Sequence, residues 1–176
     1  MVNNKFEQFL KNRQNLIDHY TKGDMTKEEF IEENYRCITA LDIKPFQRID
    51  NVKKAIYNYQ YYNVLAKYNQ KRAHDLSKKY SSREDFLEQA NYYYSKKDQV
   101  TEKLLKLLDF AGVEAYFVKV KSPYLKKKLF EIVLTDYDSI VLHSTSETIR
   151  NMLIRENVFQ QEERKSVTDS YINQKY

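Results

Sequence analysis

The chain has 176 residues, of which 41% are hydrophobic, 14% aromatic and 31% charged, and its formal net charge is +5 at pH 7. So high an aromatic content predicts one folded domain of ordinary size rather than a disordered tail. The 2 glycines and 1 cysteine exclude a glycine-rich phosphate loop, an intramolecular disulfide and a cysteine-based zinc site.

Two short helices are predicted before residue 45. Asn4 with Glu7, and Thr26 with Glu29, have the spacing of a capping box, which predicts a helix start at each place. Gly23 predicts the end of the first helix, because glycine accepts the left-handed backbone found at helix C-termini. We expect these two helices to lie end to end along the longer element that follows.

A long helical hairpin is predicted over residues 52–111, where apolar and small residues recur in steps of three and four. Ser81 and Ser82 interrupt this pattern, and Ser82 with Asp85 predicts the start of the second helix. So short a connection favours an antiparallel pair, and Gly112 is expected to end it. We call the residues that recur in this pattern the seam, the line along which each helix is expected to pack against its neighbour. The predicted seam positions are Val52, Ala55, Tyr59, Tyr62, Ala66, Asn69, Ala73, Leu76 and Tyr80, then Phe86, Ala90, Tyr93, Lys97, Val100, Leu104, Leu107 and Ala111.

After the hairpin the hydrophobic period changes to two, which predicts strands at 114–121, 128–135 and 140–143. Their short connections predict an antiparallel meander. Ser144 with Glu147 predicts the start of a final helix. The predicted fold class is therefore α+β, mostly helical. The organisation we expect is a single domain over 1–159, made of a helical bundle (1–112) and a meander with a helix (113–159), then a flexible tail (160–176).

Tyrosines crowd the predicted hairpin, and four of them lie off its two seams: Tyr57, Tyr61, Tyr92 and Tyr94. Tyrosine is enriched at protein interfaces, so these four are candidate residues of a protein-binding surface. The alternative is a bundle core in which tyrosine takes the place of leucine.

A basic segment without any acidic residue covers the predicted turn between the first two strands. Its five lysines account for the whole net charge, because the other 25 basic residues balance the 25 acidic ones. One interpretation is a finger that binds nucleic-acid phosphates, and the other is protection of a sheet edge against pairing. The five are Lys119, Lys121, Lys126, Lys127 and Lys128.

Two resemblances bear on the function. From Thr101 onward, the order helix, three strands, helix is similar to the double-stranded RNA-binding domain, which implies RNA rather than DNA as a ligand. That family has a lysine cluster at the start of its last helix, where this sequence has Ser144–Glu147. The region from Lys44-Pro45-Phe46 through Tyr57–Tyr62 resembles small bacterial families of unknown function, which implies no activity.

The titratable residues predict no catalytic or metal site. The three histidines, His19, His74 and His143, have no partner at metal-ligand spacing. Cys37 lies on the apolar side of the second helix, as a small buried residue does. Asp136 and Asp138 read more simply as turn residues than as a catalytic pair.

The function we expect is a cytoplasmic, non-enzymatic protein-interaction module that binds a protein partner or its own copy. The absence of a long apolar run predicts no contact with a membrane, and no small-molecule cofactor is expected. The alternative function is RNA binding through the lysine-rich hairpin.

Overall fold

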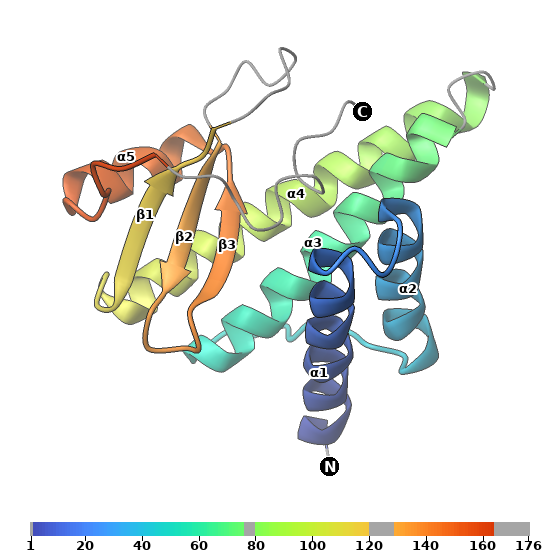
Figure 1. Cartoon of the computed structure of the whole chain (residues 1–176), viewed down its shortest axis with the longest axis horizontal. Helices are drawn as coiled ribbons and strands as arrows, with labels where there is room; N and C mark the ends of the chain where they lie inside the picture. The colour runs from blue at the N-terminus through green and yellow to red at the C-terminus, as the bar shows by residue number, and fades with distance from the viewer. Residues whose placement is uncertain (1, 76–79, 120–128, 164–176) are drawn as a thin grey trace. The chain divides into compact units, whose positions relative to one another are not determined.

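The computed structural model describes residues 2–75, 80–119 and 129–163. Two compact units divide the chain, Met1–Val100 and Thr101–Lys175, and the boundary falls inside one helix. The elements confirm the predicted α+β class (Figure 1). They are α1 (Val2–Thr21), α2 (Lys27–Ala40), α3 (Val52–Asp75), α4 (Tyr80–Leu108), β1 (Val113–Phe117), β2 (Phe130–Leu134), β3 (Ile140–Ser144) and α5 (Glu147–Arg155).

The start of α2 is the capping box expected from the sequence. The Thr26 hydroxyl accepts a hydrogen bond from the Glu29 amide at 3.1 Å, and the Glu29 carboxylate accepts one from the Thr26 amide at 2.8 Å. The box expected at Asn4 is wrong, because α1 already begins at Val2.

Four helices end in the same way, with a residue of positive φ after the last turn and a hydrogen bond back across it. Gly23, at φ 83°, confirms the predicted end of α1. Gly112 does not end α4, because Asp109 takes that position instead. The closing amide–carbonyl bonds are Asp24 to His19 (2.9 Å), Ile43 to Ile38 (2.9 Å), Phe110 to Leu105 (3.2 Å) and Val158 to Leu153 (3.2 Å).

The helices α1 and α2 lie side by side, as Figure 1 shows, so the end-to-end arrangement expected from the sequence is wrong. The buried Arg13 guanidinium donates to the Asn34 side-chain oxygen at 2.7 Å. The rings of Tyr20 and Phe30 stack with centroids 4.7 Å apart. These contacts join the two helices along their length.

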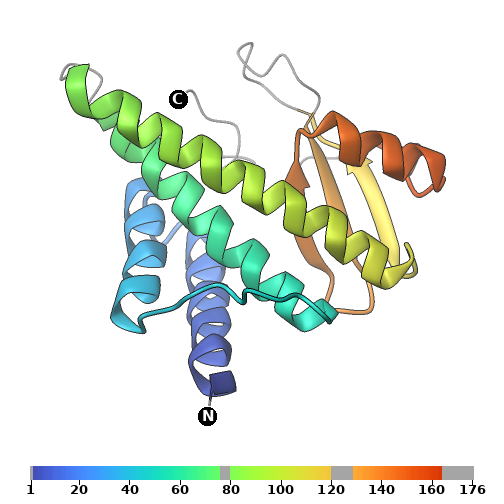
Figure 2. The ribbon, with the colours of Figure 1, turned by 180° about the vertical axis from the view of Figure 1, so that it is seen from behind.

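The helices α3 and α4 run antiparallel, as predicted, and lie side by side in Figure 2. The Arg72 guanidinium, late in α3, lies 5.5 Å from the ring centroid of Phe86, early in α4. The Lys97 ammonium, late in α4, lies 5.6 Å from the ring centroid of Tyr59, early in α3. This reversed order of contacts defines the direction of the pair.

The serine interruption expected in the hairpin is wrong, because Ser81 and Ser82 lie inside α4. Most of the predicted seam as far as Leu104 is buried, and Leu104 completely so, whereas Tyr62 and Tyr93 are only half-buried. At the next predicted seam position Leu107 is 41% exposed, and Leu105, which follows Leu104 and was not a seam position, is buried instead. The reason is that a straight helix turns every 3.6 residues, so a strict seven-residue pattern drifts around it. The seam positions Leu76 and Tyr80 fall where the structure describes no side chain.

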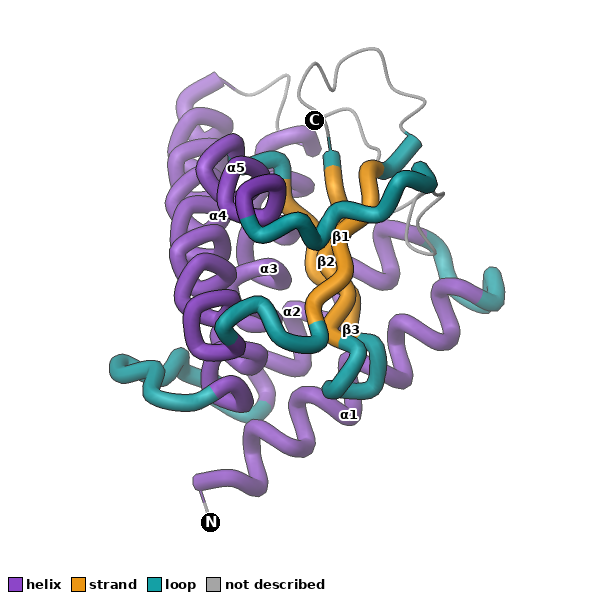
Figure 3. Tube along the Cα trace, turned by 90° about the vertical axis from the view of Figure 1, so that its left-hand side faces the viewer, coloured by secondary structure: helices purple, strands orange, loops and turns teal. Residues whose placement is uncertain are grey.

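The sheet is the predicted antiparallel meander, in the order β1-β2-β3 (Figure 3). Its register places Glu131 of β2 opposite Tyr116 of β1 and opposite His143 of β3. The outer edge of β1 pairs with the chain after α5, where Gln160 donates from its amide to the carbonyl of Ala115 at 2.8 Å. Gln160 is therefore held in place, and residues 164–176 of the predicted tail lie outside the described part of the chain.

Two predictions near the sheet differ from the structure: the cap expected at Ser144 and the helix end expected at Gly112. Ser146, not Ser144, caps α5, and its hydroxyl accepts from the Ile149 amide at 3.3 Å. Gly112, at φ 66°, leads into β1, and a Cβ on it would lie 2.5 Å from a carboxylate oxygen of Asp136. A left-handed backbone and this close approach both favour glycine here.

Candidate protein-interaction surface

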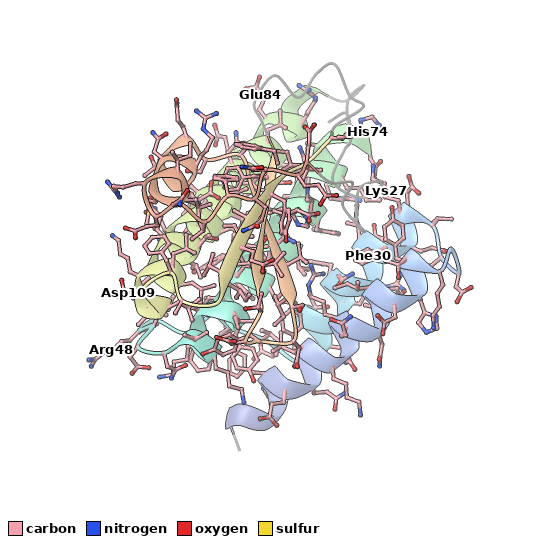
Figure 4. The ribbon with its side chains drawn as sticks, turned by 60° about the vertical axis from the view of Figure 1, so that its left-hand side comes forward. Lys27, Phe30, Arg48, His74, Glu84 and Asp109 are labelled. Atoms are coloured by element: carbon pink, nitrogen blue, oxygen red, sulfur yellow. The ribbon has the colours of Figure 1, made fainter. Side chains whose placement is uncertain are left out.

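Four tyrosines from α3 and α4 form a continuous row of ring contacts, which we call the tyrosine surface. They are Tyr61 and Tyr62 of α3 and Tyr92 and Tyr93 of α4. The ring centroids lie 5.2 Å apart for Tyr61 and Tyr62, 6.2 Å for Tyr62 and Tyr93, and 5.3 Å for Tyr92 and Tyr93. In Figure 4 the labelled Glu84 lies near the start of α4 and the labelled Asp109 directly after its end, and Tyr92 and Tyr93 belong to the helix between them.

Burial differs along this row. Tyr92 is 54% exposed, whereas the other three tyrosines are half-buried. Tyr61 and Tyr93 pack against an apolar cluster that includes Phe9 and Leu65. Burial is the main cause that raises the pKa of Tyr61 to about 12, and the nearby Tyr93 and other tyrosines are a smaller one. The inner rings are therefore held by the body of the protein, and Tyr92 presents its ring to solvent.

Charged side chains flank the exposed ring along α4. The Lys96 ammonium lies 5.6 Å from the centroid of Tyr92, close enough for a cation–π interaction. Glu88, one turn before Tyr92, is exposed. Within the part of the chain that the structure describes, neither Glu88 nor Lys96 forms an ion pair. The exposed aromatic centre thus has one acid and one base beside it.

The structure brings only part of the predicted interface together. Tyr61 and Tyr92 both belong to the tyrosine surface. Tyr57 does not, because it is 3% exposed and its ring lies 5.3 Å from Phe6, centroid to centroid. Tyr94 points elsewhere on α4 and donates its hydroxyl to the Gln70 side chain at 2.6 Å.

Tyr62 and Tyr93 were missed as surface residues because both occupy predicted seam positions. A seam position is usually interior, yet both rings remain half-exposed. The residue type was the available signal, since a tyrosine at a seam position brings its hydroxyl to the boundary with water.

The seam of α4 also contains a buried amine. Lys97 is 6% exposed, and its ammonium lies 5.6 Å from the centroid of Tyr59 and 5.2 Å from that of Tyr94. Burial lowers the pKa of Lys97 to about 8, because the charged form loses its hydration. The aromatic faces on either side compensate for part of that loss.

The lysine-rich hairpin is described at one position. Lys119 is exposed just after β1. Lys121, Lys126, Lys127 and Lys128 lie outside the described residues, so the clustering expected of these lysines stays a prediction.

The titratable residues of the sheet form a pair that sequence reasoning did not find. The His143 Nε2 atom lies 3.1 Å from Glu131 Oε1, and Glu131 is 1% exposed. Asp136 and Asp138 are exposed in the turn between β2 and β3. Period-two spacing places Glu131 on one face of β2, but an interior carboxylate is rare enough that sequence alone does not indicate it.

Among the described residues, no group of three histidine, cysteine or acidic side chains has the geometry to hold a metal ion. Cys37 is half-buried, and burial raises the pKa of its thiol, which reduces the reactive thiolate fraction. The helices that the structure describes include none with the length and hydrophobicity required to cross a bilayer.

The fold and its surface define an α+β protein with an antiparallel helical pair and a small meander. Across residues 1–176, the chain matches the model of a family of unknown function, DUF6648, and it belongs to that family. This confirms the expectation of an uncharacterised family. Neither the curated proteins nor the solved structures contain a match to the chain.

Proposed function

We propose that this chain is a non-enzymatic, cytoplasmic protein-interaction module that binds another protein chain through the tyrosine surface. The observation that carries the proposal is the row of four contacting rings, of which Tyr92 is 54% exposed. Large, amphipathic rings dominate the energy of protein interfaces.

The arrangement of the rings favours binding. Side chains that are already packed lose little rotamer freedom when a partner arrives, so less of the contact energy is lost to ordering. Tyr61 and Tyr93 are packed in this way against the apolar cluster. Truncation of Tyr92 should therefore weaken binding by about 2 kcal/mol, the size typical of an interface hot spot.

Site-specific crosslinking tests the proposal. A photoreactive amino acid at position 92, in full-length protein inside cells, should give a discrete protein adduct. The same amino acid at Glu147, an exposed residue of α5, is the matched control and should give none. Absence of an adduct from position 92, with the variant folded by circular dichroism, would refute the proposal.

RNA binding through the lysine-rich hairpin is the second candidate, favoured by the exposure of Lys119 and by five lysines without an acid. Phosphate contacts make affinity fall with salt, at a slope of about −0.7 per contact for single strands. Five contacts therefore predict a slope of about −3 to −4. Changing Lys126, Lys127 and Lys128 to glutamate should abolish binding to a single-stranded RNA, and unchanged binding would exclude this function.

A further inference from the structure

The tyrosine surface has a self-complementary arrangement of charge along α4. Glu88, Tyr92 and Lys96 follow one another in steps of four residues, so they lie on one face of the helix. The acid precedes the exposed ring by one turn, and the base follows it by one turn. Glu88 is exposed, and Lys96 is half-buried beside the ring.

A two-fold axis at Tyr92 would bring two copies of this face together with α4 antiparallel to itself. Residues at equal distances before and after Tyr92 then oppose each other. Glu88 of each copy meets Lys96 of the other, and Asp85 meets Gln99. This is the form of an isologous interface, in which the same patch serves both partners.

We propose that the occupant of the tyrosine surface is a second copy of this chain, docked with α4 antiparallel to α4. The inference rests on the proposed function and names its partner. Tyr92 from each copy lies at the centre, and the half-buried Tyr62 and Tyr93 widen the apolar contact around it. Two reciprocal Glu88–Lys96 pairs close the contact on both sides.

The charges determine the relative direction of the two α4 helices more than they contribute to the affinity. Exposed ion pairs contribute little, about 0.2–1 kcal/mol each, so the rings must provide most of the attraction. A parallel arrangement would place Glu88 against Glu88 and Lys96 against Lys96. Like charges in contact oppose association, and the antiparallel form avoids this repulsion.

Charge reversal provides the test. The molar mass of the full-length wild type, measured by sedimentation equilibrium across a range of concentrations, should rise from 21.3 kDa towards twice that value. Glu88→Lys alone and Lys96→Glu alone should each weaken self-association at least about tenfold, because each change creates two like-charge contacts. An equimolar mixture of the two variants should form a heterodimer. The double variant Glu88→Lys/Lys96→Glu should recover self-association.

Two controls make the result decisive. Glu156→Lys makes the same change of charge at an exposed residue after α5 and should leave self-association unchanged. A wild type that stays at 21.3 kDa, or single variants that associate as the wild type does, would overturn the inference. A position-92 adduct with a different protein, together with a monomeric wild type, would overturn self-association alone and leave the proposed function standing.

Discussion

Replacing Lys97 with methionine should stabilise the protein at neutral pH. The amine is 6% exposed and lies between the rings of Tyr59 and Tyr94. Burial lowers its pKa from 10.5 to about 8, which shows that the folded protein disfavours the ammonium form. Methionine has a similar length and no charge, so it fills the same space and removes the cost of burying a cation.

The sign and size of the effect follow from the two pKa values. A difference of about 2.5 between folded and unfolded states corresponds to about 3 kcal/mol. Between pH 8 and 10.5 the unfolded chain binds more protons, so wild-type stability rises with pH across that window. The folded-state pKa already includes the contacts of the ammonium with its neighbours, so the variant should gain about 3 kcal/mol at pH 7 and lose this advantage towards pH 10.5.

Urea unfolding at pH 7 and pH 10, followed by far-ultraviolet circular dichroism, measures both quantities, since the chain has no tryptophan. Lys103→Met, at an exposed position of the same helix, is the matched control and should change stability by less than about 0.5 kcal/mol. A Lys97→Met variant that is less stable than the wild type at pH 7 would refute the reasoning. So would an advantage at pH 10 as large as the advantage at pH 7.

Three further substitutions test the structure by the same unfolding measurement. Gly112→Ala should lower the free energy of unfolding by about 2 kcal/mol, because alanine is strained in the left-handed backbone and its Cβ would approach Asp136. The control is Gly23→Ala, whose added Cβ has nothing within 4 Å and which should lower it less. Equal losses would contradict the close approach at Gly112. Thr26→Ala should cost about 1 kcal/mol by removing the cap, and an unchanged midpoint would mean that the capping box contributes nothing. His143→Leu should cost about 3 kcal/mol because Glu131 loses a buried partner, and Glu131→Gln in that background should recover part of it. A loss below about 0.5 kcal/mol would show that the pair is not coupled.

Local patterns in the sequence predicted most of the fold. The capping box at Thr26, the helix end at Gly23 and the antiparallel meander were all confirmed. These features depend on residues close together in the chain, so their spacing identifies them directly. Two errors occurred where another residue could do the same work: Asp109 takes the left-handed position for which a glycine was expected, and Ser146 takes the cap expected of Ser144.

The candidate site was predictable only in part. Off-seam position indicated Tyr61 and Tyr92, which join the row of contacting rings, but it gave the same indication for Tyr57, which is buried, and for Tyr94, which bonds to Gln70. Helical periodicity gives the direction of a side chain from its own helix axis. It does not say which other helix lies there.

What the sequence by itself determined was therefore the type of each element, its approximate ends and the hydrophobic face it must bury, because each depends on neighbours along one stretch of chain. The tertiary structure decided that α1 and α2 lie side by side, that Glu131 meets His143 across two strands, and that four tyrosines from two helices join in one surface. These outcomes depend on packing between segments distant in sequence, where many arrangements satisfy the same local pattern and only the fit of whole surfaces selects one.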